Sequence, residues 1–254
     1  MTERSEDLSK RTLRALSLIT VALLWEAVGR TGDAHLLPPL STILWAWVEL
    51  FRSGELIRAM LVSFQALILG YLLSVALGIP LGLIMGRYRR IEAFLDPYMT
   101  ALLVVPTISF IPLLVIAFGL GLHSRVWIVF LFAFVYVVAN TAAGVRNVDP
   151  TLAEMACSFG ARERDLFLKV ILPAALPMIM AGLRLGMGRA VLGMITSEVV
   201  LAVVGFGAML MSFSASFQTP ALFATILTII FLAVAILAFI QSLERHVMPW
   251  RATS

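Results

Sequence analysis

The sequence predicts an all-α, polytopic membrane protein with about six transmembrane helices. Hydrophobic residues fill 61% of its 254 positions and charged residues only 13%, against roughly 25% charged residues in a soluble domain. The mean hydropathy is +0.99. The charged residues gather in short clusters between long apolar runs, which is typical of a bilayer protein with short polar loops.

Six apolar runs approach the roughly 20 residues that a helix needs to cross the hydrocarbon core. The predicted spans are Leu13–Val28, Ala59–Gly86, Pro97–Leu120, Val126–Val145, Ile171–Val204 and Pro220–Leu243. The first run ends in Trp25-Glu26, where a signal peptide would need small residues, so we expect it to be retained. Pro173 and Pro177 interrupt the fifth run, which predicts that this span begins near Pro177.

A mixed segment, residues 37–56, separates the first two runs and is too short to cross the membrane. Ser41 follows two prolines and is the predicted N-cap of a short helix. Trp45, Trp47 and Phe51 lie beside charged residues, which favours a helix at the membrane surface.

The distribution of basic residues predicts the orientation. With the N-terminus inside, thirteen of the 19 Lys and Arg residues fall on the inner side and four on the outer side, namely Arg30, Arg52, Arg58 and Arg125. Cytoplasmic loops carry such an excess. We therefore predict cytoplasmic tails at 1–12 and 246–254, a transmembrane domain at 13–245 and a cytoplasmic loop at 146–170.

Glycines recur at four-residue spacing in two of the spans: Gly78, Gly82 and Gly86 in the second, and Gly182 and Gly186 in the fifth. Small residues on one helix face let helices approach closely in lipid. The spacing predicts either packing within the chain or an interface between subunits.

Several kinds of chemistry are absent from the sequence. It has no Gly-Lys-Ser/Thr segment of an ATP-binding P-loop. The spacings of a zinc protease and of a serine hydrolase elbow are missing too, and no metal site is predicted. The net charge of +4 comes without a basic face outside the membrane runs, so no nucleic acid partner is expected.

The longest inner loop begins with strong helix-start chemistry. Asp149 before Pro150 predicts an N-cap with proline in the first turn, and Thr151 with Glu154 matches the Thr-x-x-Glu capping box. We expect a helix from about Pro150 to 159 that ends at Gly160. Its apolar residues nearly encircle it, which favours docking into a groove of another protein.

This loop resembles the EAA signature of membrane subunits of bacterial ATP-binding-cassette importers, in the residues Glu154, Met155, Ala156, Gly160, Val170, Leu172 and Pro173. The departures are Met155 and Val170, where the signature has Ala and Ile. The resemblance implies a type I importer permease whose loop helix couples to the ATPase subunit, with coupling residues Thr151, Leu152, Glu154, Ala156, Phe159 and Gly160.

The likeness extends from about Leu37 to Arg251 and is closest to the nitrate, sulfonate and taurine branch of these importers. It implies a pore-forming permease in the inner membrane that moves a small, anionic solute into the cytoplasm. The implied partners are ABC ATPase subunits, a solute-binding protein outside and a second permease copy as a homodimer. ATP and Mg²⁺ would bind to the ATPase, so this chain needs no cofactor and is no enzyme itself.

Ionisable residues inside a span are costly and indicate function by default. Arg184, Arg189 and Glu198 lie in the fifth run. With a start near Pro177, Arg189 would lie about 18 Å along the helix, close to the bilayer midplane. It either faces the translocation path, where it would suit an anion, or is structural.

Pro106 and Pro112 interrupt the third run around Thr107 and Ser109. These two polar residues, with Asn140 and Thr196 in other spans, are further candidates for the path. Broken backbone at membrane depth is tolerated where it lines a water-filled cavity. Ordinary hydrogen bonding between helices is the alternative.

Two other functions remain as alternatives. An ion-driven secondary transporter would show repeated broken helices with intramembrane acids, but only Glu26 and Glu198 are acids near the membrane. A membrane enzyme or a non-transporting subunit is the other alternative. A neighbouring gene for a P-loop ATPase would discriminate among the three.

Overall fold

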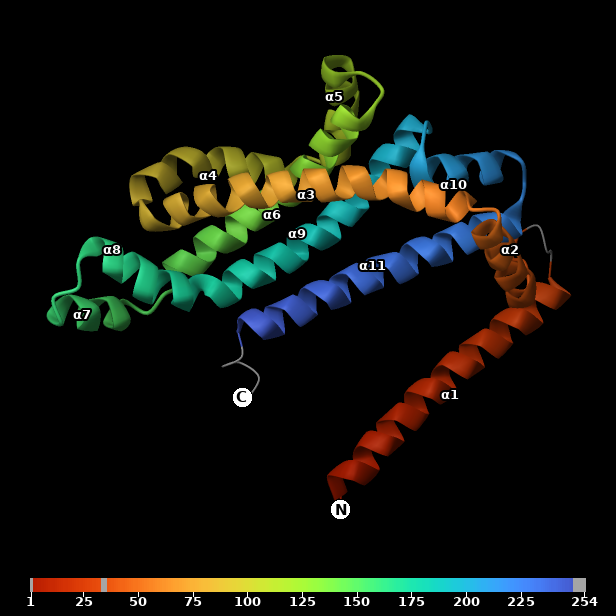
Figure 1. The fold of residues 1–254 in the computed structure, drawn as a ribbon, viewed down its shortest axis with the longest axis horizontal. Helices are drawn as coiled ribbons and strands as arrows, with labels where there is room; N and C mark the ends of the chain where they lie inside the picture. The colour runs from red at the N-terminus through yellow and green to blue at the C-terminus, as the bar shows by residue number, and fades with distance from the viewer. Residues whose placement is uncertain (1, 33–35, 249–254) are drawn as a thin grey trace.

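The computed structural model describes residues 2–32 and 36–248, and this part of the chain is helical without any strand (Figure 1). Residues 249–254 of the predicted C-terminal tail lie outside it. The helices are α1 (Thr2–Thr31), α2 (Leu40–Arg52), α3 (Glu55–Arg87), α4 (Arg89–Val104), η1 (Thr107–Phe110), α5 (Ile111–Phe118), α6 (Leu122–Arg146), α7 (Pro150–Ser158), α8 (Glu163–Leu166), η2, a π-helical turn (Phe167–Ile171), α9 (Leu172–Leu201), α10 (Gly205–Ala215) and α11 (Thr219–Val247).

The core is a bundle in which α6 lies between α3 and α9. The glycines of α3 allow this packing, because a Cβ added at Gly82 would lie 2.6 Å from the Thr141 Cβ, and one at Gly86 would lie 2.6 Å from the Val145 Cβ. A methyl group at either position would force the helices apart. The glycine stripe on α3 therefore packs within the chain, as one of the two predicted alternatives required.

The glycines of α9 contact the other side of α6. A Cβ at Gly182 would lie 2.6 Å from the Asn140 Cβ, and one at Gly186 would lie 2.8 Å from a Val137 methyl group. Both stripes thus bring a neighbouring helix against α6, which explains why α6 has more buried residues than either α3 or α9.

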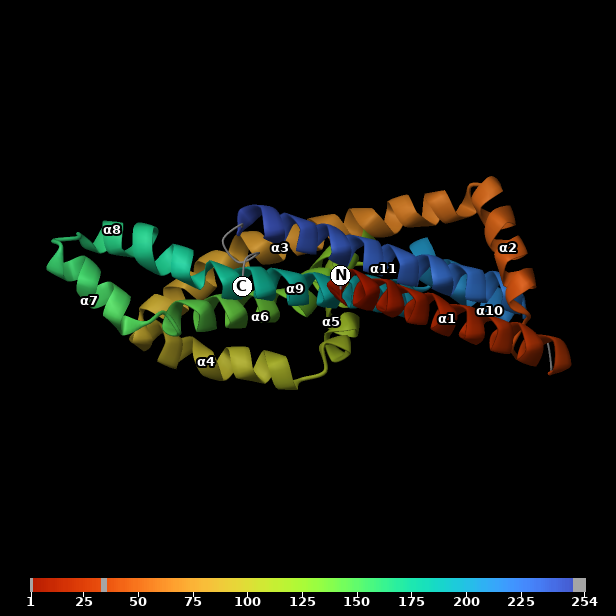
Figure 2. The ribbon, with the colours of Figure 1, turned by 90° about the horizontal axis from the view of Figure 1, so that it is seen from below.

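Helices α7 and α8 lie at one end of the molecule, and α2 and α10 lie at the other (Figures 1 and 2). Helix α11 runs beside α9, and α1 meets the rest of the molecule near α2. There the Trp25 ring contacts the Phe223 ring of α11 edge to face at 5.8 Å. The short helices therefore lie at the two opposite ends of the long ones, which is the arrangement expected if the long helices cross a bilayer.

Four of the described helical segments are long and apolar enough to cross a membrane: α3, α6, the continuous segment Glu163–Leu201 and α11. The pair Arg89–Val104 and Thr107–Phe118 becomes a fifth if it is counted as one broken span. Helix α1 contains the predicted first span but is not among these four, so its crossing stays a prediction. The predicted tail 1–12 is part of the same helix from Thr2 onward.

The third predicted span is broken where proline interrupts its sequence, and the fifth begins earlier than predicted. The third is bent by 97° next to Pro106, because the residue before a proline is driven out of the helical region. The fifth begins well before Pro177, which lies inside α9. Pro173 occupies the first turn of α9, directly after the π-helical turn Phe167–Ile171. The backbone hydrogen bond that proline cannot donate therefore falls where the hydrogen-bond pattern already departs from that of an α-helix.

The helix predicted between the first two spans is confirmed as α2, while its place at the membrane surface stays a prediction, and Ser41 is not its N-cap. The helix begins at Leu40, and Pro39 occupies the cap position. The Ser41 amide and hydroxyl instead donate to the Glu26 carboxylate of α1 at 3.0 and 2.9 Å. A carboxylate from another helix thus accepts a hydrogen bond from a free backbone amide in the first turn of α2, where negative charge is stabilising.

Candidate functional site

The helix α7 is the first candidate site, and local chemistry determines where it begins. The Asp149 carboxylate accepts hydrogen bonds from the Thr151 amide at 2.9 Å and from its hydroxyl at 2.6 Å, while Pro150 lies in the first turn. The predicted capping box of Thr151 and Glu154 is wrong. Asp149 already occupies the N-cap, which leaves Thr151 inside the helix rather than before it.

The end of α7 is a Schellman motif. Gly160 has φ of 76°, and the Ala161 amide donates to the Ala156 carbonyl at 3.0 Å while the Gly160 amide donates to the Cys157 carbonyl at 2.9 Å. These are the two bonds of the motif, which needs a left-handed residue after the cap. The prediction that Gly160 ends the helix is confirmed.

The side chains of α7 are open to other molecules. Phe159 is 87% exposed, Met155 54% and Leu152 43%, Glu154 is exposed, and Ala156 is half-buried. An exposed cluster of large apolar side chains on a short helix at the end of a molecule marks an interaction site. The docking role of these residues stays a prediction.

The Asp149 cap makes the order of α7 dependent on pH. Hydrogen bonds from the Thr151 hydroxyl and amide lower the pKa of the Asp149 carboxyl below its ordinary value of 3.8. The carboxylate therefore stabilises α7 at any pH above that value, and the stabilisation is lost as the pH falls through the lowered pKa.

We expect Asp149→Ala to reduce the hydrogen-exchange protection of the α7 amides at neutral pH, since the cap is lost. Asp149→Asn is the matched control, because asparagine caps as well but does not titrate. Its protection should not depend on pH after correction for intrinsic exchange rates. Equal protection in Asp149→Ala and the parent would contradict the assigned cap.

The second candidate site is an open hollow of about 320 Å³ between α6, α9 and the broken α4–α5 segment. We call it the Arg189 hollow. Three predicted path residues line it together, Thr107, Arg189 and Thr196, and Tyr136 lies with them. The Arg189 guanidinium carbon lies 4.5 Å from the centre of the Tyr136 ring, which is a cation–π contact. The structure thus gathers residues from three separate segments around one cation.

Two other predicted path residues do not line the hollow. Ser109 lies in η1 and faces outward. The Asn140 side-chain amide donates to the Tyr136 carbonyl at 2.8 Å, and its Cβ packs against Gly182 of α9. Asn140 therefore serves helix packing, the alternative that the sequence left open.

The two arginines of α9 have different environments. Arg184 donates to the Glu244 carboxylate of α11 at 3.4 Å, so it is a structural ion pair. Arg189 is exposed and has no acidic partner among residues 2–32 and 36–248. The depth derived from a start at Pro177 no longer applies, but Arg189 precedes Leu201 by twelve positions, or about 18 Å of helix, and so stays far from the C-terminal end of α9.

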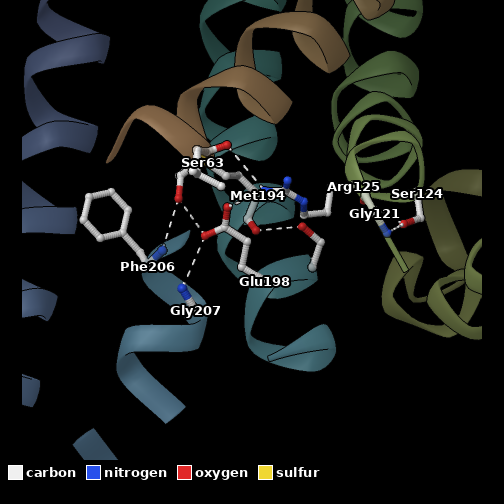
Figure 3. Close-up of polar contacts among 10 residues, drawn as sticks. Ser63, Gly121, Ser124, Arg125, Met194, Glu198, Phe206 and Gly207 are labelled. Atoms are coloured by element: carbon white, nitrogen blue, oxygen red, sulfur yellow. Dashed lines mark hydrogen bonds and ion pairs between the residues drawn. The ribbon is translucent and has the colours of Figure 1, made fainter. Parts of the chain in front are cut away.

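A third group of polar residues is buried where α3, α6, α9 and α10 meet (Figure 3). The Glu198 carboxylate accepts hydrogen bonds from the Ser63 hydroxyl at 2.7 Å, from the Arg125 guanidinium at 3.2 Å and from the Gly207 amide at 3.3 Å. The Ser63 hydroxyl also accepts from the Phe206 amide at 3.2 Å. We call this group the polar cluster. It holds the N-terminus of α10 against the bundle.

Two glycines make room for the polar cluster. A Cβ at Gly205 would lie 2.4 Å from a Glu198 carboxylate oxygen, and Gly205 has φ of 73°. One at Gly207 would lie 2.2 Å from the Glu198 carbonyl carbon. Only glycine lets this backbone reach the carboxylate, so the turn into α10 depends on both positions.

Sequence reasoning missed this cluster. Arg125 was predicted to lie in an outer loop, but its side chain is 7% exposed and Glu198 is fully buried. The signal was the glutamate itself, because a buried carboxylate requires a cation or several donors. Arg125 stands directly before an apolar run, yet its partner lies 73 positions away, a pairing that only the folded bundle creates.

Residues 78–250 match the family described as the binding-protein-dependent transport system inner membrane component. The chain belongs to this family. The matched region contains α7, the Arg189 hollow and both ends of the Arg125–Glu198 pair. The protein is thus a multi-pass permease subunit of an ABC importer, and the family is defined by its use of a separate binding protein.

Among its relatives, this permease is 37% identical to a permease protein named for aliphatic sulfonates, SsuC of Bacillus subtilis, over 91% of this chain and 84% of that one. It is 32% identical to the taurine permease TauC of Escherichia coli over 79% and 73% of the two chains. It is also 31% identical to the formylaminopyrimidine permease ThiX of Halalkalibacterium halodurans over 95% and 98%.

The permease also resembles a solved structure, described as the crystal structure of an amino acid ABC transporter with histidines. The TM-score is 0.56 at 20% identity, covering 80% of this chain and 95% of that chain. This likeness shows that the two chains share a fold. The prediction of an all-α importer permease of the sulfonate and taurine branch is confirmed by these comparisons together.

Proposed function

We propose that this permease moves a small sulfonate into the cytoplasm through a path that includes the Arg189 hollow. The observation that carries the proposal is the exposed guanidinium of Arg189, set over Tyr136 and beside Thr107 and Thr196. The names of the sulfonate and taurine relatives point to the same class of cargo.

The chemistry of the hollow suits such an anion. A planar guanidinium donates two parallel hydrogen bonds to the oxygens of a sulfonate or carboxylate, and the threonine hydroxyls offer further donors. A cation within a span is costly unless it serves a path or is paired. An anion that passes Arg189 would be its transient partner.

We propose a homodimer as the working form. The hollow is open on one side, and the residues at its rim are apolar and exposed, with Val104 at 75% and Ile108 at 49%. A second copy placed against this rim would close the path between two Arg189 side chains. Such closure also explains why α5 projects from the bundle (Figure 1).

The energy would come from a separate ABC ATPase that binds ATP and Mg²⁺, since this chain has no P-loop segment. Helix α7 would dock into it through Leu152, Met155 and Phe159. The cap on Thr151 defines the start of this helix, and Gly160 defines its end. This arrangement requires α7 and both termini to be cytoplasmic. A solute-binding protein would deliver the cargo at the opposite end.

Substitution of Arg189 tests the path. In vesicles that contain the permease, its ATPase and its binding protein, Arg189→Lys should reduce taurine or alkanesulfonate uptake, because lysine keeps the charge but loses the planar fork. Arg189→Gln should reduce it further, by about 10- to 100-fold, since hydrogen bonds to charged groups contribute about 1.5–3 kcal/mol. The readout is radiolabelled uptake at matched amounts of assembled complex.

The matched control is Arg184→Gln, on the same helix, which removes the pair with Glu244 outside the hollow. It should leave uptake close to the parent. Parental uptake by Arg189→Gln would show that the residue is structural and would remove the anion argument.

A flat heteroaromatic cargo is a second candidate. Tyr136 and Phe132 line the same hollow, and aromatic rings stack on planar ligands. The relative named for formylaminopyrimidine matches nearly the whole chain. Uptake of a pyrimidine that survives Arg189→Gln but fails in Tyr136→Ala would favour this cargo over a sulfonate.

A further inference from the structure

An open groove of about 630 Å³ lies between the end of α3 and the segment formed by α8 and the π-helical turn. Both elements lie at the end of the molecule that carries α7 (Figures 1 and 2). One part of the groove is apolar and consists of Pro80, Leu83 and Ile84 of α3 and Phe167. Leu83 and Phe167 rest on the buried cluster around Ile171, so the floor of the groove belongs to the packed core.

The other part of the groove is charged and lies where α3 leaves its apolar stretch. Arg87 donates to the Glu163 carboxylate at 2.8 Å, and Tyr88 and Arg164 lie beside this pair. Arg164 is exposed and has no hydrogen-bond or ion-pair partner in the described part of the chain. Two arginines and one glutamate leave one positive charge in excess, and the exposed pair at 89–90 adds two more nearby.

Both walls of the groove depart from regular helix. Pro80 lies inside α3 and cannot donate to the preceding turn. The opposite wall is the π-helical turn Phe167–Ile171, a form that is rare and often found at functional sites. The groove thus combines an apolar channel, a basic mouth and two disturbed helices.

We propose that this groove holds one phospholipid with an anionic headgroup. An acyl chain would lie along Leu83, Ile84 and Phe167, and the phosphate would accept hydrogen bonds from Arg164 and the Tyr88 hydroxyl. Basic pockets between helices on the cytoplasmic side of a membrane bind lipids of this charge. The proposal rests on the proposed function only for the orientation that makes this end cytoplasmic.

The charge of the groove distinguishes this occupant from others. A zwitterionic lipid has a phosphate too, but its ammonium group cancels that charge and would be repelled by the excess arginine. A second copy of the chain would bring its own basic residues against the same mouth. An anionic lipid complements the charge and extends along the apolar wall into the bilayer. Its phosphate would also relieve the repulsion between Arg87 and Arg164.

Native mass spectrometry of the purified permease tests the proposal directly. With phosphatidylglycerol added we expect one retained lipid, and with phosphatidylcholine at the same concentration at least fivefold less retention, since its net charge is zero. Arg164→Gln should reduce retention about fivefold, because a basic residue at the membrane surface contributes about that factor toward an anionic lipid. Arg52→Gln, which changes an exposed arginine at the opposite end, is the matched control and should retain lipid like the parent.

A second variant tests the apolar wall. Ile84 is 42% exposed, so Ile84→Trp is expected to fold while it fills the channel and excludes the acyl chain. Glycerol phosphate in excess should not displace the lipid, because it has no acyl chain. Retention of both lipids alike, retention unchanged in Arg164→Gln, or displacement by glycerol phosphate would each overturn the proposal. The measurement does not depend on transport, so it tests lipid binding whether or not the proposed cargo is correct.

Discussion

Glu198→Ala is expected to destabilise the folded permease by about 3–5 kcal/mol, because it leaves Arg125 as an unpaired charge in the bundle. Both side chains are almost fully enclosed, at 7% and 0% exposure, so the Arg125 guanidinium would lose its charged partner without gaining full hydration. The same change frees the Ser63 hydroxyl and the Gly207 amide. Thermal unfolding in detergent, followed by loss of the monodisperse peak in size-exclusion chromatography, measures the effect.

Two controls separate this effect from simple loss of an ion pair. Glu244→Ala removes the partner of Arg184, a pair that is 17% and 42% exposed at 3.4 Å, and should cost less than about 1 kcal/mol. The double variant Arg125→Met with Glu198→Met should recover much of the loss, since no buried charge remains. If Glu198→Ala were as stable as Glu244→Ala, the polar cluster would not hold α10 in place.

Gly160→Val is expected to abolish most substrate-stimulated ATPase activity while the permease still inserts into the membrane. Gly160 has φ of 76°, and a β-branched residue in this region costs about 1–3 kcal/mol of strain. The chain would relieve the strain by unwinding the end of α7, which displaces Phe159 from its docking position. The readout is ATP hydrolysis by the assembled complex with and without loaded binding protein.

The matched control is Gly54→Val. Gly54 has φ of 79° with nothing within 4 Å of an added Cβ, and Gly160 is equally unobstructed. The two variants therefore carry similar strain at opposite ends of the molecule, and only the one next to α7 should lose coupling. Loss of stimulation in both variants would trace the defect to general instability, and normal stimulation in Gly160→Val would remove α7 from the coupling mechanism.

Features that depend on neighbours in the sequence were predicted well. Asp149 with Pro150 begins α7, and Gly160 ends it, because capping involves backbone groups within a few residues. Pro106 marks the bend of the α4–α5 segment for the same reason. One local error arose where a distant group intervened, since Glu26 of α1 occupies the donors of Ser41. The other, the capping box of Thr151, arose from a neighbour, because Asp149 already holds the N-cap.

The sequence by itself determined that this protein is a helical membrane permease, since composition, the length of the apolar runs and the EAA-like loop are properties of the linear chain. Only the tertiary structure decided that both glycine stripes face α6, that Thr107, Arg189 and Thr196 share one hollow while Asn140 does not, and that Arg125 reaches Glu198. Spacing along a helix defines which residues share a face. It does not define which neighbour that face meets, because this depends on how all the helices pack at once.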